Sequence, residues 1–315
     1  MSIYVSGSLA FDRIMNFNGY FQDHILKDRL HMLNVCFMVD NMVVRRGGCA
    51  GNIAYTLALM GEKPSILSTV GRDFAEYREH LAGMGIRLDG VQVDEKLFTA
   101  LCYITTDRSN NQITGFYAGA MLTPSTYAFP GIAAGDLAIV SPGNMDDMQR
   151  FPDVYRENGV RFIFDPGQQM PLYTKETLSR AIRGAFAYVS NDYELGLTCK
   201  LLELGREEDL LDSVEWIITT MAADGCRVRG RDGTDTVIPA LPCANVADPT
   251  GAGDSQRSGL LFGLAHGLSV PEAARYGSVT ASYAIEHQGT QEHSFTFEDF
   301  RGRYEAAFGP MPVTF

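Results

Sequence analysis

The segment DPTGAGD at residues 248–254 combines small residues with a single well-placed carboxylate. Gly251, Ala252 and Gly253 carry little or no side chain, so their backbone N–H groups can converge on an anion where a helix begins. Asp254 would lie in the first turn of that helix, where it could take a proton from an attacking hydroxyl. The pattern predicts phosphoryl transfer to an alcohol. The alternative is an aspartate-capped turn ahead of a core helix.

A second glycine-rich segment, RRGGCAGN at residues 45–52, precedes a predicted helix. Gly47 and Gly48 allow the backbone to approach a ligand closely, and the Asn52 side chain offers both a donor and an acceptor. This combination suits a polyol.

Two better-known phosphate-binding motifs are missing from the sequence. It contains no G-x-x-x-x-G-K-[ST], and no G-x-G-x-x-G follows a predicted strand. The six histidines include no H-E-x-x-H pair, so no transition metal is predicted. Phosphate binding at a helix N-terminus therefore remains as the expected mode.

Composition narrows the class of protein. The chain has 315 residues, of which 45% are hydrophobic and 20% charged, and a formal net charge of −12. The acidic balance argues against nucleic-acid and anionic-membrane partners. Six cysteines without a C-x-x-C pair fit a reducing compartment, and no apolar run resembles a signal or a membrane span. We therefore expect a soluble cytoplasmic protein.

Strand-like and helix-like segments alternate along most of the chain. This alternation predicts an α/β fold with a mostly parallel central sheet covered on both faces, and ligands at the carboxyl ends of its strands. A hairpin and three helices should close the fold. The predicted strands are residues 2–8, 64–70, 137–141, 161–165, 187–190 and 216–220; the predicted helices are 50–60, 74–84, 145–158 and 174–183; the hairpin joins 226–229 to 236–238, and the last helices start at Ser255, Pro271 and Phe297.

Two segments interrupt the alternation. Residues 14–46 and 96–117 are rich in Phe, Tyr, Val, Met and Thr and show little helical period. They predict a small inserted β-sheet that could act as a lid over the site or as a homodimer interface. The core would then comprise residues 1–13, 47–95 and 118–315. The alternative is an edge extension of the main sheet.

Together with residues 7–12, the two glycine motifs resemble the PfkB or ribokinase-like family of ATP-dependent sugar and nucleoside kinases. The resemblance covers nearly the whole chain and implies a ribokinase-like three-layer α/β/α fold. More specific blocks look most like bacterial adenosine kinases. These blocks are NQITGFYAGAM at 111–121, DPGQQ at 165–169, SNDYE at 190–194 and EHQGTQE at 286–292.

The resemblance assigns roles on the acceptor side of the site. Residues that would grip ribose hydroxyls are Ser8, Asp12, Gly47, Gly48 and Asn52. A carboxylate that accepts hydrogen bonds from two hydroxyl groups would reject analogues that lack these hydroxyls. By the same resemblance, Phe116 would stack on a purine, while Gln168 and Gln169 would hydrogen-bond to the polar edge of the purine and to the ribose. The alternative for these three is a core phenylalanine and a surface glutamine pair.

The resemblance also assigns the donor side. Asn191 and Glu194 match an N-x-x-E motif that helps to hold Mg²⁺ and phosphates through water, as Mg²⁺ prefers. Thr219, Thr220 and Gly225 would form the ATP-binding loop. Asp248 and Thr250, with the backbone near residues 286–289, resemble a monovalent-cation site for K⁺.

Four positions depart from the family pattern. Ser255 and Gln256 stand where a small residue and an aromatic are usual, which puts the packing beneath the anion site in doubt. Ala222 replaces an expected glycine in the ATP-binding loop, and Cys102 replaces a frequent aromatic in the predicted lid.

Three hypotheses remain open from the sequence. The first is an adenosine kinase that transfers the γ-phosphoryl group of Mg·ATP to the ribose 5′-hydroxyl, with Asp254 as general base. The second is a kinase of free sugars or of a broader nucleoside set; Phe116 and the glutamine pair favour the first, because a free sugar offers no flat ring to stack. The third is a ligand-binding relative without turnover, because fold alone does not establish activity.

Overall fold

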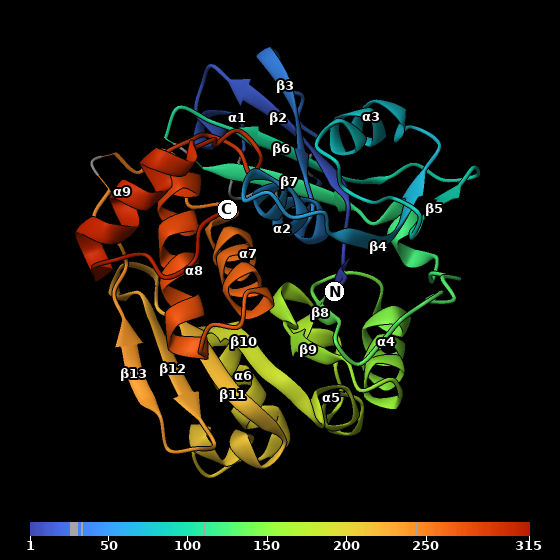
Figure 1. Cartoon of the computed structure of the whole chain (residues 1–315). Coiled ribbons are helices and arrows are strands. Elements are labelled where there is room, and N and C mark those ends of the chain that lie inside the picture. Colours follow the sequence, from blue (N-terminus) through green and yellow to red (C-terminus); the bar gives the residue numbers. More distant parts are fainter. Residues whose placement is uncertain (26–30, 33, 110, 244) are drawn as a thin grey trace.

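The computed structural model describes residues 1–315 except 26–30, 33, 110 and 244, and it contains two β-sheets (Figure 1). The larger sheet has nine strands in the order β13-β12-β11-β10-β9-β8-β1-β4-β5. Neighbouring strands from β11 to β5 run parallel, whereas β12 and β13 are antiparallel at one edge. The strands are β1 (Ile3–Ser6), β4 (Ser65–Gly71), β5 (Val91–Asp94), β8 (Leu137–Val140), β9 (Arg161–Phe164), β10 (Ala185–Asn191), β11 (Val214–Thr220), β12 (Cys226–Gly230) and β13 (Asp235–Ile238).

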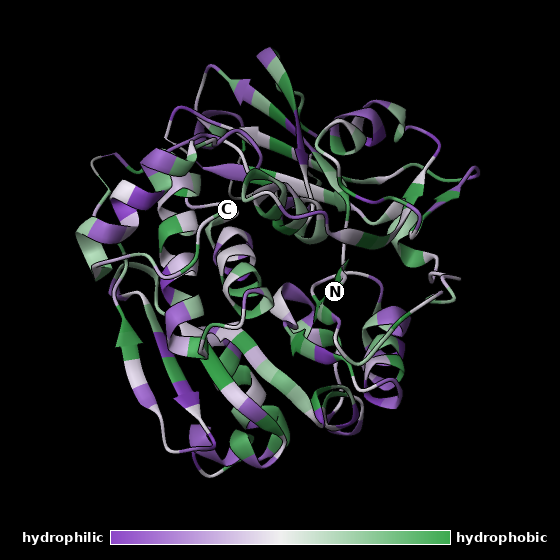
Figure 2. Ribbon diagram, viewed as in Figure 1, coloured by the Kyte–Doolittle hydropathy of each residue, from purple (hydrophilic) through white to green (hydrophobic). Residues whose placement is uncertain are grey.

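Helices cover both faces of this sheet. Two separate hydrophobic clusters lie on its two sides, so that β1 buries Val5 on one face and Tyr4 on the other. Figure 2 shows the corresponding hydrophobic strands between helices of mixed character. On the Val5 side lie α2 (Cys49–Leu59), α3 (Ala75–Gly83), α7 (Ala252–Ala265), α8 (Val270–Ile285) and α9 (Phe297–Phe308); on the Tyr4 side lie α4 (Met145–Glu157), α5 (Lys175–Ile182) and α6 (Asp192–Leu202).

Local sequence explains where several helices begin. In α8, the Ser269 hydroxyl accepts the Glu272 N–H while the Glu272 carboxylate accepts the Ser269 N–H, with Pro271 in the first turn. Helix α6 begins with the same reciprocal pair, formed by Asn191 and Glu194. Helix α7 begins at Ala252, earlier than the expected Ser255, because Gly251 adopts a left-handed conformation (φ 80°) that lets the chain turn into the helix.

The smaller sheet has four strands in the order β3-β2-β6-β7. They are β2 (Ala10–Phe17), β3 (Val39–Gly47), β6 (Ala100–Thr106) and β7 (Gln112–Tyr117), and the short helix α1 (Phe21–His24) follows β2. This sheet is separate from the large one, as predicted, and it lies above the carboxyl ends of the core strands in Figure 1. The exact division into core and lid at residues 14–46 and 96–117 stays a prediction.

Among the elements that were not expected, two belong to the main sheet and its covering helices. Strand β5 adds a further parallel strand beside β4, and α6 follows β10 directly. Neither β5 nor α6 is a long amphipathic segment, so the periodic spacing of hydrophobic residues that predicted the other elements is weak in both. The mostly parallel three-layer arrangement is nevertheless confirmed.

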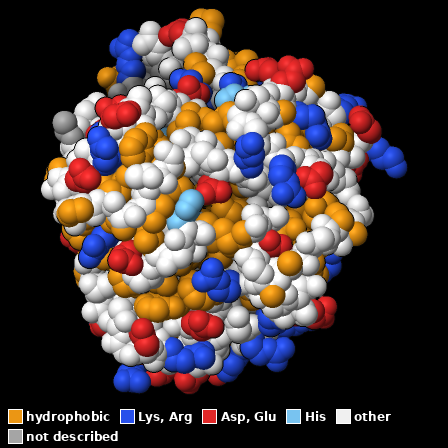
Figure 3. Space-filling view, in the orientation of Figure 1, with side chains coloured by type: hydrophobic (Ala, Val, Ile, Leu, Met, Phe, Trp, Pro, Cys, Tyr) orange, Lys and Arg blue, Asp and Glu red, His pale blue; other side chains and the backbone are white. Residues whose placement is uncertain are grey.

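In the space-filling view, hydrophobic side chains gather over the middle of the face that carries α7 and α8, with charged side chains scattered around them (Figure 3). Within the part of the chain that the structure describes, no helix is long and apolar enough to cross a membrane.

Candidate active site

A cavity of about 1380 Å³ opens at the carboxyl ends of the core strands, beneath the small sheet. The residues that closely follow β1, β8 and β9 contribute Ser8, Pro142 and Asp165, as expected for a parallel sheet. Its volume exceeds that of a typical single-ligand pocket, about 300–1000 Å³, and is large enough for two substrates. Predicted residues that line it are Ser8, Asp12, Gly48, Asn52, Phe116, Gln168, Gln169, Asn191, Glu194, Thr220, Gly225, Thr250, Gly251, Ala252, Gly253 and Asp254.

The start of α7, where the DPTGAGD motif predicts an anion site, exposes backbone N–H groups without helical partners. The first intrahelical bond runs from the Ser255 N–H to the Gly251 carbonyl at 2.9 Å, which leaves the preceding N–H groups outside the helical pattern. The Ala252 N–H donates to the Pro249 carbonyl at 3.3 Å. Within the described residues, the N–H groups of Gly251, Gly253 and Asp254 have no backbone acceptor, so these three are the donors free for an anion.

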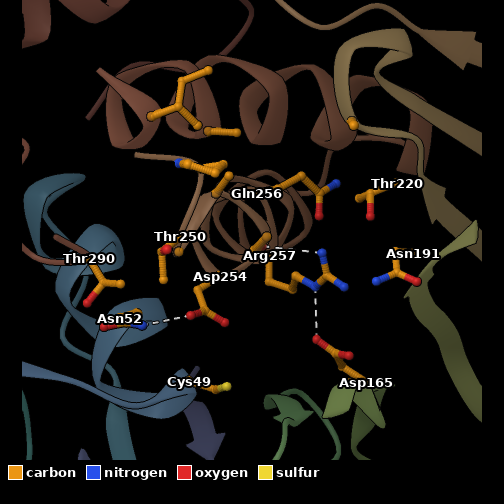
Figure 4. Close-up of a pocket in the computed structure, with 18 of the residues that line it drawn as sticks. Cys49, Asn52, Asp165, Asn191, Thr220, Thr250, Asp254, Gln256, Arg257 and Thr290 are labelled. Atoms are coloured by element: carbon orange, nitrogen blue, oxygen red, sulfur yellow. Dashed lines mark hydrogen bonds and ion pairs between the residues drawn. The ribbon is translucent and has the colours of Figure 1, made fainter. Parts of the chain in front are cut away.

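The Asp254 carboxylate lies beside these donors and faces α2 (Figure 4). Its Oδ2 accepts a 2.7 Å hydrogen bond from Asn52 Nδ2. Burial raises the pKa of Asp254 to about 6, although the Asn52 amide and the Arg257 guanidinium both lower it. A carboxyl with such a pKa is mostly ionised at neutral pH yet basic enough to accept a proton, which suits a general base.

Asn52 is itself held in place by residues distant in sequence. Gln291 Nε2 donates to Asn52 Oδ1 at 3.0 Å and also bonds to the Tyr77 hydroxyl, which donates to the Gly47 carbonyl at 3.0 Å. Gly47 does not line the cavity, but its carbonyl anchors the Tyr77 end of this network. The chain of bonds fixes the amide orientation so that Nδ2 points at Asp254.

The small sheet brings a row of residues to the cavity. Asp12 pairs with Cys102 across β2 and β6, and Cys102 pairs with Phe116 across β6 and β7, so their side chains share one face. All three line the cavity. Burial, followed by the Asp248 charge, raises the pKa of Asp12. Phe116 is 58% exposed, so its ring is available to a ligand.

The glutamine pair lies in a short 3-10 helix, Gly167–Leu172, after β9. Gln169 Nε2 donates to the Gly143 carbonyl at 2.8 Å, whereas Gln168 Nε2 makes only a 3.7 Å contact with Cys49 Sγ. Cys49 is the first residue of α2, and its N–H donates to Ser8 Oγ at 3.1 Å. Gln168 is thus the freer of the two to meet a ligand.

The donor side gathers Asn191, Glu194, Thr220 and Gly225 along the same cavity. Glu194 accepts the Asn191 N–H at 2.9 Å, and burial raises its pKa. The N-x-x-E motif therefore caps α6 in addition to facing the cavity. Thr219 does not line the cavity; strand alternation points its side chain to the opposite face from Thr220.

One departure from the family pattern, Ala222, lies in the loop after β11. The backbone of Ala222 is left-handed, with φ 49°, so the expected glycine would be unstrained there while alanine is not. Gly225 in the same loop has φ 86°, and a Cβ on it would lie 2.1 Å from the Ile238 carbonyl. Only glycine fits at Gly225, whereas the loop tolerates a strained alanine at 222.

Asp248 and Thr250 form the turn that leads into α7. Asp248 Oδ1 accepts the Thr250 N–H at 2.9 Å, and its Oδ2 accepts the Gly289 N–H at 3.2 Å. Thr250 lines the cavity and Asp248 lies behind it. The loop at 286–289 is thereby tied to the DPTGAGD segment.

Sequence reasoning missed an ion pair at the centre of the site. Arg257 Nε donates to Asp165 Oδ2 at 2.9 Å, and both side chains are almost completely buried. Arg257 stands three residues after Asp254, about one helical turn along α7. That spacing was the available signal, but the partner Asp165 lies 92 residues away.

The other two departures in α7 lie beside this pair. Ser255 Oγ is 3.3 Å from Thr56 Oγ1, so its hydroxyl is satisfied. Gln256 is only 4% exposed, and within the described residues neither polar atom of its carboxamide has a partner. Figure 4 shows this side chain on the side of the cavity where Thr220 lies. The expected doubt about packing therefore concerns Gln256 alone.

Comparison with known proteins identifies the class of this site. The pfkB family of carbohydrate kinases matches residues 18–296, and the chain belongs to this family. It is therefore a kinase that transfers a phosphoryl group to a hydroxyl acceptor, on a ribokinase-like fold, as the sequence predicted.

Particular relatives share most of their length with the chain. A nucleoside kinase of Methanocaldococcus jannaschii is 31% identical over 261 residues, covering 82% of this chain and 85% of the relative. A second nucleoside kinase, from Methanothermobacter thermautotrophicus, is 27% identical over 310 residues, covering 97% of this chain and 96% of the relative. The structure of Burkholderia thailandensis nucleoside kinase in complex with inosine is 38% identical, covers 99% of each chain and has a TM-score of 0.84.

Proposed function

We propose that this chain is a nucleoside kinase that phosphorylates the 5′-hydroxyl of adenosine or a related nucleoside with ATP. The observation that carries the proposal is the Asp254 carboxylate, hydrogen-bonded to Asn52 and adjacent to unpaired N–H groups at the start of α7 within the described residues. The cavity around it accommodates two substrates. Relatives named nucleoside kinase, including one solved with inosine, support a nucleoside acceptor.

In the proposed reaction, Asp254 accepts the proton of the 5′-hydroxyl while the hydroxyl oxygen attacks the γ-phosphorus of ATP. The new oxygen–phosphorus bond forms while the bond to the leaving ADP oxygen breaks. The N–H groups of Gly251, Gly253 and Asp254 would stabilise negative charge on the transferring group. Asp12 and Asn52 would hold the ribose hydroxyls, and Phe116 would stack on the base.

The donor side fits a magnesium–nucleotide complex. One carboxylate oxygen of Glu194 accepts the Asn191 N–H at the start of α6, which leaves the other oxygen for the cavity, and Mg²⁺ readily binds carboxylates through water. Mg²⁺ would neutralise phosphate charge when bound. Thr220 and Gly225 would contact the donor, and Asp248, Thr250 and the 286–289 backbone would hold a potassium ion.

An acceptor panel tests the proposal. ADP release would be measured with adenosine, inosine, cytidine, ribose and fructose at equal concentration. Turnover with nucleosides well above ribose and fructose is expected, because Phe116 can stack only on a base. Turnover confined to free sugars would contradict the proposal, and no ADP release with any acceptor would favour a relative without turnover.

Within the nucleosides, the same panel separates a strict adenosine kinase from a broader enzyme. The inosine complex of the Burkholderia thailandensis relative favours the broader set. Equal turnover of adenosine and inosine would place this chain there. A strong preference for adenosine would indicate that the base edge is read through its amino group.

We also propose a homodimer formed through the small sheet. Met42, Val44, Tyr103 and Ile113 are exposed apolar residues on its strands, and a second copy would cover them. Sedimentation of the native protein, compared with a Met42→Lys and Ile113→Lys double variant, tests this. A dimer that the double variant converts to a monomer is expected, and a monomer in both cases would contradict the proposal.

A further inference from the structure

The guanidinium of Arg257 lies at the junction of the two halves of the cavity. It is 5% exposed and lines the cavity beside Asp254, and Figure 4 shows it between Asp254, Asp165 and Asn191. Acceptor-side groups lie on one side of it and donor-side groups on the other. A phosphoryl group that moves from donor to acceptor must pass through this region.

The protein holds two of the three nitrogens of the Arg257 guanidinium. Nε donates to Asp165 Oδ2 at 2.9 Å, and Nη1 donates to the Gly253 carbonyl at 3.4 Å. Within the described residues, Nη2 donates to no carbonyl or side chain, and in Figure 4 the guanidinium extends toward the side where Asn191 lies. The Arg257 guanidinium is therefore fixed in orientation, and its Nη2 is left to bind a ligand.

Gly253 leaves room for the guanidinium in this position. A Cβ on Gly253 would lie 3.2 Å from Arg257 Nη1, so a larger residue would crowd the guanidinium and shift it by a few tenths of an ångström. The same glycine presents one of the free N–H groups at the start of α7. Backbone donors and the guanidinium thus converge on one position.

We propose that Arg257 is a catalytic residue that donates a charge-assisted hydrogen bond to the transferring phosphoryl group, and that Asp165 is its positioning residue. The inference rests on the proposed kinase function and deepens it. Arginine pairs strongly with phosphate oxygens and remains charged throughout the reaction. Asp165 holds the planar group so that little ordering is needed when the substrates bind.

The test compares the affinities for two nucleotides that differ by the γ-phosphate. Binding of Mg·ADP and of the non-hydrolysable Mg·AMP-PNP would be measured by calorimetry for the wild type and for Arg257→Met. Removal of a charge-assisted bond should weaken AMP-PNP binding about 10-fold or more and leave ADP nearly unchanged. The kcat should fall on the order of 10²–10³-fold, since phosphate-directed arginines have effects of that size or larger.

Arg257→Met leaves Asp165 buried without its partner and could unfold the protein. The double variant Arg257→Met with Asp165→Asn removes both charges and keeps the test available. It should show the same selective loss of affinity for AMP-PNP. Arg257→Lys, which keeps the charge but not the planar fork, should recover part of the kcat.

Arg229 supplies a matched control. It is 2% exposed and pairs with Glu207 at 2.7 Å and Glu208 at 2.8 Å, but it does not line the cavity. Arg229→Met should lower the melting temperature without changing the ratio of the two affinities.

An AMP-PNP to ADP affinity ratio that is the same in the wild type and in both Arg257→Met variants would overturn the proposal. An equal loss of affinity for ADP and AMP-PNP would do so too. A wild type that phosphorylates no acceptor would instead contradict the proposed function. The two failures are therefore distinguishable, because the binding ratio does not depend on turnover.

Discussion

The two sheets of this molecule differ in how they carry functional residues. The central strand β1 is buried along its whole length, whereas every residue of β7 is exposed. In the core, Asn52, Asp254 and Arg257 are already bonded to one another or to fixed neighbours. In the small sheet, the Phe116 ring meets solvent. Under the proposed function, the core would therefore prepare the chemistry, and the small sheet would complete binding.

The difference between the sheets predicts that core substitutions act on kcat and that small-sheet substitutions act on KM. The largest effect is expected for Asp254→Asn, because it removes the general base while keeping its shape. Turnover should fall about 10²–10⁴-fold, with nucleoside affinity nearly unchanged. Steady-state kinetics and calorimetry with the nucleoside measure the two effects, and wild-type turnover in this variant would exclude Asp254 as the base.

Asp12→Ala should come next and should act on binding. Asp12 is on β2 and lines the cavity, so its removal would delete the charge-assisted hydrogen bonds proposed to ribose hydroxyls, each worth about 1.5–3 kcal/mol. The nucleoside KM should rise at least about 10-fold for each such hydrogen bond that is removed. Asp12→Asn, which retains size, serves as the comparison; unchanged affinity in both variants would remove Asp12 from the site.

The pH dependence should follow the ionisation of Asp254. Its pKa is raised to about 6 by burial, so kcat/KM should be constant well above pH 6 and fall about tenfold for each unit below it. A pH–rate profile of the wild type measures this limb. An acid limb near pH 4 would show that a different group, or an unshifted carboxyl, limits the reaction.

The same ionisation affects stability in a defined direction. The folded pKa exceeds the unfolded value, so this carboxyl contributes stability that is present below the unfolded pKa and lost as pH rises through about 6. Asp254→Asn should therefore raise the melting temperature more at pH 8 than at pH 5. A larger gain at pH 5 would contradict the buried-charge explanation.

The smallest effect is expected for Phe116→Ala. An aromatic stack contributes about 0.5–1.5 kcal/mol beyond simple burial, so the nucleoside KM should rise several-fold while kcat stays constant. Gln112→Ala is the control, because Gln112 is also exposed on β7 but neither lines the cavity nor belongs to the proposed dimer surface. Similar effects of both substitutions would indicate a general loss of sheet stability.

Strong local patterns made much of the fold and site predictable. The DPTGAGD segment predicted the helix start, and the alternation predicted the parallel sheet, because each depends on residues adjacent in the chain. Arg257 with Asp165, and Gln291 with Asn52, could not be predicted, since these contacts join residues 92 and 239 positions apart. The sequence raised a doubt about packing at both Ser255 and Gln256, and only the structure shows that, within the described residues, it is the Gln256 carboxamide that lacks a partner.

The bond between Asn52 and Asp254 joins residues 202 positions apart. During synthesis at about 5–20 residues per second, α2 emerges on the order of 10–40 seconds before its partner is made. A nascent or truncated chain without α7 therefore lacks the pair proposed to act in catalysis, however well its first half is folded. Enzymatic turnover is for this reason a reporter of completed assembly, and its recovery during refolding should trail the appearance of secondary structure.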